Sequence, residues 1–398
     1  MTRPHTPETT LPPPAPEALA LSLQLCDLIR AEIAAAGGAL SFARYMELAL
    51  YAPGLGYYSA GSQKFGVQGD FITAPEISPL FARCLARQCR QVLNALGGGA
   101  ILEFGAGSGV LAVELLLELE RLDSLPSTYF ILELSAELRA RQQCLLSQRA
   151  AHLLDRIRWL ESLPAGGLRG VVLANEVLDA MPVQLFVRSA GALKERCVAC
   201  EDQGFIWRDV PAGAPLTQAV AALQAALPAS LPGGYCSEIN PALPGWITSL
   251  AAMLEQGVAL LIDYGYPRRE YYLPERSAGT LMCHYRHRVH ADPLILTGLQ
   301  DITAHVDFTA LAAAGSAAGL TIAGYTTQAH FLLGSGLPEL VAASDPQDLA
   351  AHLAITDQIK RLTLPGEMGE RFKVLALARG LEDLPLSGFA LRDLRGRL

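Results

Sequence analysis

The chain of 398 residues has little lysine and no excess of basic charge. Only four of its 31 basic residues are Lys, and 39 acidic residues give a net charge of −8. Because binding to a phosphate backbone needs a basic surface, this balance argues against nucleic acid as a partner. The sequence also lacks an apolar stretch long enough to cross a bilayer, so no membrane insertion is expected. Since 51% of the residues are hydrophobic, the chain can build a large core.

The sequence also lacks the cysteine pattern of a disulfide framework. Its eight cysteines are scattered, which is typical of reduced thiols in a cytosolic protein. Cys197 and Cys200 form one close pair, and without a second such pair two thiols on a strand are favoured over a zinc or redox site. Residues 1–16 are rich in Pro and Thr and are expected to be disordered. They contain no apolar signal region and too few Arg for a mitochondrial presequence, so we predict a cytoplasmic protein.

From residue 100 onward, apolar strand patterns alternate with helical patterns. This alternation predicts an α/β fold with a mostly parallel sheet covered by helices on both faces. We expect the last strand to lie at an antiparallel edge of the sheet. The predicted strands are 100–104, 129–134, 156–160, 170–174, 258–262, 321–327 and 372–378. The predicted helices are 109–121, 136–150, 244–256, 308–319 and a helical region at 340–362.

The remaining segments suggest additions to this core. Residues 17–96 form a helical N-terminal cap, with Ser41 as an N-cap and a structured loop or lid at 65–79 that ends where Ser78-Pro79 begins a helix. Two halves of the core domain, 97–182 and 241–382, flank a β-rich insertion at 183–240. The latter half carries a further insertion at 266–306, and 383–398 is a tail.

A glycine-rich turn follows the first predicted core strand, in Glu103-Phe-Gly-Ala-Gly-Ser-Gly109. Gly105, Gly107 and Gly109 bring bare backbone N–H groups and a helix N-terminus toward a ligand. A glycine turn alone can also serve only to pack a helix on a sheet. Glu133, at the end of the second strand, can accept hydrogen bonds from a ribose diol. This spacing fits an S-adenosylmethionine site better than a nicotinamide site.

Polar residues at the strand ends complete the candidate site. We interpret Glu176 and Asp179 as catalytic carboxylates able to grip a guanidinium, with capping of a following helix as the alternative. Cofactor contacts are expected from Glu103 and Asn175, although Glu103 can instead fix the loop. The spacing of the histidines between His284 and His290 fits no metal site. The candidate substrate-binding residues are Asp263, Tyr264, Glu76, His305 and Asp307.

Several motifs together resemble the MidA family of S-adenosylmethionine-dependent methyltransferases, which includes a respiratory complex I assembly factor. They are F-G-V-Q-G-D-F-I-T-A-P-E-I-S-P, E-F-G-A-G-S-G-V-L, A-N-E-V-L-D-A-M-P-V, I-D-Y-G-Y and H-A-D-P-L-I-L-T-G-L-Q-D-I-T-A-H-V-D-F. The resemblance implies a class I methyltransferase fold with a Rossmann-like seven-stranded sheet. It also implies protein arginine N-methylation, with a respiratory NADH-quinone oxidoreductase subunit as the partner protein.

The resemblance assigns cofactor binding to Gly105, Gly107, Gly109 and Glu133, and the family's acidic motif to Asn175, Glu176 and Asp179. Phe104 and Ala106 depart from the common form of the glycine turn without harm to binding, whereas Cys283 and His284 bear on the identity of the substrate. Two other functions fit the same residues. One is a small-molecule N- or O-methyltransferase, and the other is a non-catalytic assembly protein that retains the cofactor site.

Overall fold

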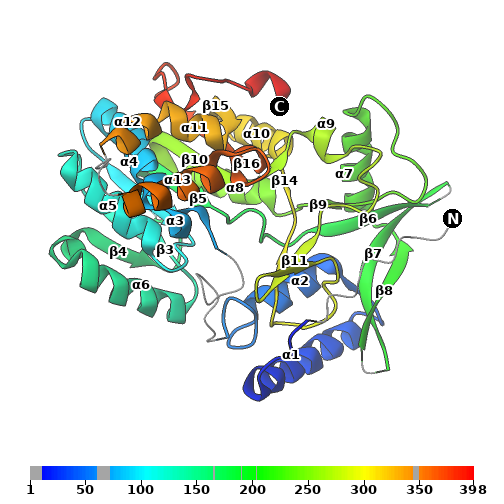
Figure 1. Ribbon diagram of the computed structural model, residues 1–398. Coiled ribbons are helices and arrows are strands. Elements are labelled where there is room, and N and C mark those ends of the chain that lie inside the picture. The colour runs from blue at the N-terminus through cyan, green and yellow to red at the C-terminus, as the bar shows by residue number, and fades with distance from the viewer. Residues whose placement is uncertain (1–10, 61–71, 165, 190, 203, 344–348) are drawn as a thin grey trace.

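A mostly parallel sheet of eight strands forms the centre of the molecule (Figure 1). The computed structural model describes residues 11–60, 72–164, 166–189, 191–202, 204–343 and 349–398. Seven strands follow the order β15-β16-β10-β5-β2-β3-β4, which confirms the predicted seven-stranded sheet, and the short β14 pairs with the end of β10. These strands are β2 (Ala100–Phe104), β3 (Tyr129–Leu132), β4 (Ile157–Leu160), β5 (Leu168–Asn175), β10 (Leu254–Tyr266), β14 (Val306–Asp307), β15 (Thr321–Thr327) and β16 (Phe372–Arg379).

Helices cover both faces of this sheet, because alternate side chains of each strand enter two different cores. In β5, for example, Val171 and Leu173 face one core, and Val172 and Ala174 face the other. The first core is covered by α4 (Pro79–Leu96), α5 (Val110–Arg121), α6 (Ala136–Arg149), α11 (Gln328–Gly334), α12 (Leu337–Ala342) and α13 (Leu349–Thr363). The second is covered by α8 (Leu243–Met253) and α10 (Phe308–Ala317).

The last strand differs from its predicted place. β16 is antiparallel, as expected, but it lies inside the sheet between β10 and β15 instead of at the edge. The physical reason is its apolar composition: its residues from Phe372 to Ala378 are all buried, and a strand buried on both faces needs pairing partners on both sides.

β10 is longer than predicted at both ends. The predicted helix 244–256 ends at Met253, and residues 254–256 belong to the strand instead. At its other end the strand continues past Ile262 to Tyr266, so Asp263 pairs with Lys373 inside the sheet. A residue expected at the rim is therefore completely buried.

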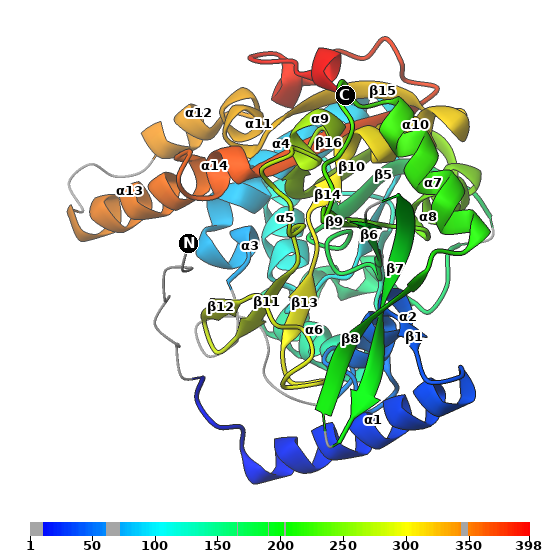
Figure 2. The same ribbon diagram turned by 90° about the vertical axis from the view of Figure 1, so that its right-hand side faces the viewer.

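A second, antiparallel sheet lies beside the first (Figures 1 and 2). Its strands are β1 (Leu40–Ser41), β6 (Gln184–Ser189), β7 (Ala192–Glu201), β8 (Gly204–Pro211) and β9 (Cys236–Ile239). Helix α7 (Ala214–Ala225) packs against it, and a small three-stranded sheet is formed by β11 (Met282–Tyr285), β12 (Arg288–His290) and β13 (Asp301–Thr303). Cys197 and Cys200 both lie on β7, where a spacing of three places their side chains on opposite faces of the strand.

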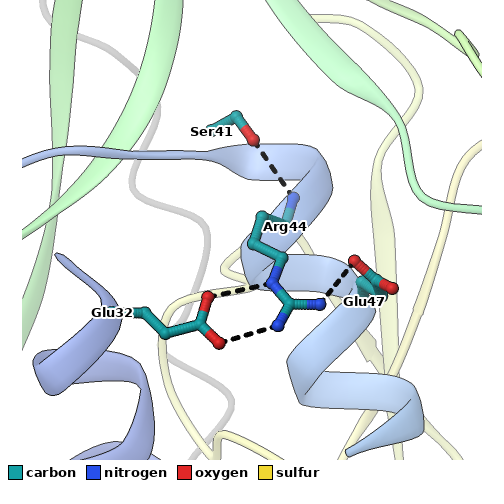
Figure 3. Close-up of polar contacts among 4 residues, drawn as sticks. All are labelled: Glu32, Ser41, Arg44 and Glu47. Carbon is teal, nitrogen blue, oxygen red and sulfur yellow. Dashed lines mark hydrogen bonds and ion pairs between the residues drawn. The ribbon is translucent and has the colours of Figure 1, made fainter. Parts of the chain in front are cut away.

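The N-terminal helices pack on this second sheet, away from the large one (Figure 2). They are α1 (Pro16–Ala35) and α2 (Phe42–Tyr51), and Ser41 caps α2 by accepting a hydrogen bond from the Arg44 N–H at 3.3 Å. Arg44 also joins the two helices, since its guanidinium donates to both oxygens of Glu32 at 2.9 and 2.7 Å and to Glu47 at 2.8 Å (Figure 3). The predicted disorder of 1–16 lies outside the described residues up to residue 10, and α1 begins at Pro16.

Short helices surround the carboxyl ends of the parallel strands. They are α3 (Ala74–Ile77), α9 (Arg268–Tyr271) and α14 (Met368–Arg371). Ser78 caps α4 by accepting from the Leu80 N–H, as predicted, whereas residues 65–71 of the expected lid lie outside the described part of the chain. The strand order reverses between β2 and β5, which is where open α/β sheets bind their ligands. None of the described helices is long and apolar enough to cross a membrane.

Candidate active site

A cavity of about 2130 Å³ opens where the parallel strands end. Its walls come from α2, from the turns after β2, β3, β5 and β10, and from the segment that carries α14. Typical ligand sites have volumes of roughly 300–1,000 Å³. This cavity therefore has room for a nucleoside cofactor together with part of a second, larger molecule.

The glycine turn after β2 forms one wall of the cavity. Gly105, Gly107 and Gly109 have φ angles of 59°, 53° and 86°, a region that residues with a Cβ rarely adopt. Gly105 and Gly107 line the cavity, whereas Gly109 does not. A Cβ at Gly109 would lie 3.2 Å from the Gln142 Cα, so the third glycine packs the start of α5 against α6.

Glu133 lies beside this turn and retains acceptor capacity for a ligand. Its Oε1 accepts from the Ser135 N–H at 2.9 Å, and its Oε2 accepts from the Gln142 side chain at 3.1 Å. A carboxylate has about four lone-pair sites, so about two remain for hydroxyls of a bound sugar. Burial raises the pKa of Glu133, an effect that these two hydrogen bonds partly offset.

Gln142 is a site residue that the sequence did not reveal. Its fully buried amide donates to Glu133 and, at 3.0 Å, to the Gly107 carbonyl, and its oxygen accepts from the Trp159 indole at 3.0 Å. It thereby fixes Glu133 and the glycine turn relative to each other. A glutamine within a helical stretch carries no sequence signal of this role, because its partners lie on three other segments.

Glu103 is hydrogen-bonded to the neighbouring strand β3 and not to the glycine turn in the described part of the chain. It is 3% exposed, and its Oε2 accepts from the Tyr129 hydroxyl at 2.7 Å, although part of it reaches the cavity wall. Burial raises the pKa of Glu103 to about 7, which the Tyr129 hydrogen bond partly offsets and the nearby Glu133 charge reinforces.

Glu176 occupies a strained position at the end of β5. Its φ is 55°, its N–H donates to the Ile262 carbonyl at 2.9 Å, and its carboxylate accepts from the Asn175 amide at 3.1 Å. Burial raises the pKa of Glu176 to about 8, and repulsion by Asp179 adds to the shift. Strain and a raised pKa at one residue are common features of functional sites.

Asp179 lies in the same turn and lines the same cavity. Burial raises the pKa of Asp179 to about 6. The Tyr264 hydroxyl, which lines the same cavity, interacts with the Asp179 carboxylate and partly offsets this rise in pKa. The helix-capping alternative is wrong, since residues 176–183 form bends and turns and no helix.

Asp263 has a supporting role instead of the predicted substrate contact. Its side chain is fully buried and does not line the cavity. Its Oδ2 accepts from the N–H groups of Leu178 and Asp179 at 2.9 and 3.2 Å, and its Oδ1 accepts from Tyr264 N–H at 2.9 Å. Asp263 therefore shapes the turn that carries Glu176 and Asp179.

Two other predicted substrate residues lie outside the cavity lining. Asp307 caps α10 through the N–H groups of Thr309 and Ala310, each at 3.0 Å, and pairs with Arg268 at 3.2 Å. It lines a separate cavity of about 180 Å³. Glu76, on α3, does not line the large cavity, although its charge contributes to the raised pKa of Glu176.

Aromatic residues line the cavity on the side of the carboxylates. Tyr51 and Tyr58 stack with ring centroids 5.5 Å apart; the Tyr51 hydroxyl donates to the Ala180 carbonyl at 2.9 Å, and the Tyr58 hydroxyl donates to Asp301 at 2.9 Å. His305 also lines the cavity, and its ring is edge-on to Tyr264 at 5.0 Å. Tyr51, Tyr58 and Asp301 are further residues that the sequence did not single out.

These features meet the requirements of a nucleoside cofactor with a sulfonium group. Gly105 and Gly107 leave backbone exposed, Glu133 has free lone pairs, and the Asn175 Oδ1 is a buried acceptor without a partner in the described structure. Next to them, Glu176 and Asp179 offer two carboxylates beside aromatic rings. The arrangement can hold a nucleoside on one side of the cavity and a cationic acceptor on the other.

Comparisons with known proteins agree with this site. Residues 84–326 match the family described as "Putative S-adenosyl-L-methionine-dependent methyltransferase". Protein arginine methyltransferase NDUFAF7, mitochondrial, of Danio rerio is 29% identical over 373 residues, which cover 86% of this chain and 84% of that protein. The Drosophila melanogaster homolog is 28% identical, with 92% and 88% covered.

A solved structure is similar over almost the whole chain. A Burkholderia thailandensis protein crystallised with S-adenosyl-homocysteine is 47% identical, with a TM-score of 0.93. The match covers 98% of this chain and 100% of that one.

Proposed function

Because the chain belongs to the family of S-adenosyl-L-methionine-dependent methyltransferases, we propose that it methylates arginine side chains of a partner protein. The observation that supports this acceptor is the pair Glu176 and Asp179, two partly desolvated carboxylates on the wall that also carries the glycine turn. Relatives whose names specify protein arginine methylation cover most of the chain.

The cofactor is held by the wall around β2 and β3. Gly105 and Gly107 allow its close approach, and Glu133, oriented by Gln142, accepts hydrogen bonds from its ribose. When bound, S-adenosylmethionine supplies an activated methyl group, whose transfer to nitrogen breaks one C–S bond, forms one N–C bond and releases one proton.

The carboxylates position the acceptor. A guanidinium presents a planar fork of N–H donors, which Glu176 and Asp179 can accept. Holding this group against the cofactor supplies most of the catalysis expected for an in-line transfer. Asp179, with a pKa near 6, is also able to receive the released proton.

A labelled-methyl assay tests the proposal. Purified protein, labelled S-adenosylmethionine and a cell extract should give a labelled protein band, with the label on arginine after hydrolysis. Glu176→Gln should lower this transfer by about 100-fold while S-adenosyl-homocysteine still binds, because the change removes an interaction with the acceptor. The matched variant Glu201→Gln, on exposed β7 surface, should behave as wild type. Label confined to small molecules would contradict the proposal, as would cofactor binding with no transfer.

We also propose two finer statements, of which the resemblance implies the first and the N-terminal sequence predicts the second. The first is that the partner is a subunit of a respiratory NADH-quinone oxidoreductase, which mass spectrometry of the labelled band identifies or excludes. The second is a cytoplasmic location, which fractionation of cells that contain the protein tests directly.

A further inference from the structure

Three arginines line the large cavity without a carboxylate partner in the described part of the chain. Arg276, Arg361 and Arg371 form no ion pair with any described residue, although the protein has an acidic excess. Arg44, in contrast, lines the same cavity but is neutralised by Glu32 and Glu47 (Figure 3). A cavity wall with unpaired positive charge is a site for an anion.

Arg276 is held in place by an aromatic ring and not by an acid. Its guanidinium lies 4.2 Å from the ring centroid of Tyr266, and its Nε is buried without a hydrogen-bond partner among the described residues. The His305 ring stacks on the same tyrosine at 5.4 Å and 5°. The Lys373 ammonium lies 5.8 Å from that ring and donates to backbone carbonyls. Glu270 and Glu370 act electrostatically on Lys373, but they form their ion pairs with Arg397 and Arg392, so no described carboxylate pairs with Arg276 or Arg371.

The uncharged state of His305 limits the positive charge to the arginines and Lys373. Burial, and then the charge of Arg276, lower the pKa of His305 to about 4, and Lys373 and Arg371 contribute further. His305 is therefore neutral near pH 7. Its ring packs on Tyr266 and adds no charge to the cluster.

The sheet order places this cation cluster away from the cofactor wall. Along the rim the strands run β3, β2, β5, β10 and β16. Glu133 and the glycine turn follow β3 and β2, Glu176 follows β5, and Tyr266 and Arg371 lie at the rim ends of β10 and β16. The two carboxylates therefore lie between the cofactor wall and the cations. At about 4.8 Å per strand, β16 is roughly 10 Å from β5, a span that an extended peptide covers in about three residues.

We propose that the protein acceptor carries a carboxylate about two to four residues from its target arginine, and that Arg276 and Arg371 bind this group. The inference rests on the proposed function, since it assumes that Glu176 and Asp179 hold the arginine. An acidic side chain and the carboxyl terminus of a protein offer the same chemistry. The cluster would then select acceptors in which positive and negative charges are spaced to match the two parts of the cavity.

Four peptides around one arginine test this selectivity. Two of them carry Glu or Gln three residues after the arginine, and the other two are the Gln sequence shortened to end at that residue, once as a free acid and once as an amide. For the wild-type protein we expect kcat/KM about tenfold higher for the Glu peptide than for the Gln peptide, mainly through KM. The comparison of free acid with amide shows whether a chain terminus serves equally well.

Variants then locate the effect. Arg276→Gln and Arg371→Gln should each reduce the preference for Glu over Gln to near onefold, with S-adenosyl-homocysteine affinity unchanged. Arg371 is exposed, so its variant should fold even if Arg276→Gln does not. Arg169→Gln, at the opposite end of β5, is the matched control and should keep the full preference.

The outcomes separate this inference from the proposed function. Equal rates on acidic and neutral peptides would overturn the inference alone, as would variants that keep the preference. Weaker cofactor binding by Arg276→Gln would also overturn it, because the cations would then serve the cofactor's own carboxylate. Failure of every arginine peptide while the cofactor analogue binds would overturn the proposed function as well.

Discussion

At the scale of single residues, Gly107 offers the most direct test of the cofactor site. Its φ of 53° lies in a region that β-branched residues avoid, so Gly107→Val introduces strain of about 1–3 kcal/mol in the wall that must approach the ligand. We expect S-adenosyl-homocysteine affinity to fall by about 10- to 100-fold, measured by calorimetry. Gly191→Val is the control, since that glycine has a φ of 82° in a hairpin turn with open space around it. Equal affinity of both variants would refute the glycine-turn assignment.

A second prediction at this scale concerns the effect of Gln142 on cofactor affinity. Gln142→Met keeps the size of the side chain but removes the hydrogen bonds to Glu133, the Gly107 carbonyl and Trp159. Since the lost bonds orient the cofactor wall, S-adenosyl-homocysteine affinity should drop by about tenfold, with kcat at saturating cofactor changed far less. Gln148→Met, on the same helix but exposed, should leave the affinity unchanged. A fall in kcat with no change in affinity would speak against this positioning role.

At the scale of elements, local sequence patterns predicted the strands and helices well, because each follows its own periodicity. They failed where a partner strand decides the outcome. The extension of β10 to Tyr266 is fixed by pairing with β16 and β14, which no local pattern reveals. This one extension moves Asp263 from the rim into the sheet, and so changes its role from substrate contact to support of the turn.

The residues of the candidate site likewise fall into those that a local motif predicts and those that depend on distant contacts. Gly105, Gly107, Glu133, Glu176 and Asp179 were recognisable because a motif after a strand predicts its own position at the rim. The residues that were missed depend on contacts between distant segments. Tyr58 meets Asp301 across 243 positions of the chain, and Gln142 meets Gly107 across 35. Such pairs are set by the tertiary structure and have no local signature.

A prediction at the scale of elements concerns the interactions that hold the N-terminal helices together. Helix α1 is held by buried apolar residues such as Ile29, and by the ion pair between Glu32 and Arg44 (Figure 3). Loss of a buried Ile side chain costs about 2–5 kcal/mol, whereas an exposed ion pair contributes up to about 1 kcal/mol. Ile29→Ala should therefore increase hydrogen exchange across residues 16–35, and Glu32→Gln should change it little. Exchange in β2 and β5 serves as the internal control, and a larger effect of Glu32→Gln would contradict this ranking.

At the scale of the whole molecule, the buried carboxylates of the site lower the stability of the fold when they are ionised. Glu103, Glu176 and Asp179 all have raised pKa values, chiefly through burial, because the cavity that must receive a cation desolvates them beforehand. A bound cationic acceptor would offset this penalty by favouring the charged carboxylates. Acceptor binding should therefore strengthen as the pH rises, while the free protein loses stability over the same range. The two effects have one origin.

This origin gives a pH prediction for the free protein between pH 6.5 and 8. The pKa of Glu176 is about 8 when folded, against a reference of 4.5, so the folded state binds more protons and its stability falls as the pH rises toward 8. Glu103, with a pKa of about 7, acts in the same direction. The pKa of His305 shifts the opposite way, from 6.5 to about 4. The rise in stability that its deprotonation produces is therefore nearly complete by pH 6.5. The pKa of Lys373 is lowered from 10.5 to about 8, so its titration changes the stability mainly above pH 8.

We therefore expect the free energy of unfolding to fall by about 1 kcal/mol or more between pH 6.5 and 8, measured by denaturant unfolding without ligand. Glu176→Gln removes the titrating group but keeps a hydrogen-bonding partner for Asn175, so this variant should be more stable than the wild type at pH 8 and should show a smaller pH slope. Glu201→Gln, on the exposed surface of β7, should reproduce the wild-type slope. An unchanged slope in Glu176→Gln would mean that Glu176 is ionised throughout this range. Binding of a cationic acceptor would then not change the ionisation of Glu176.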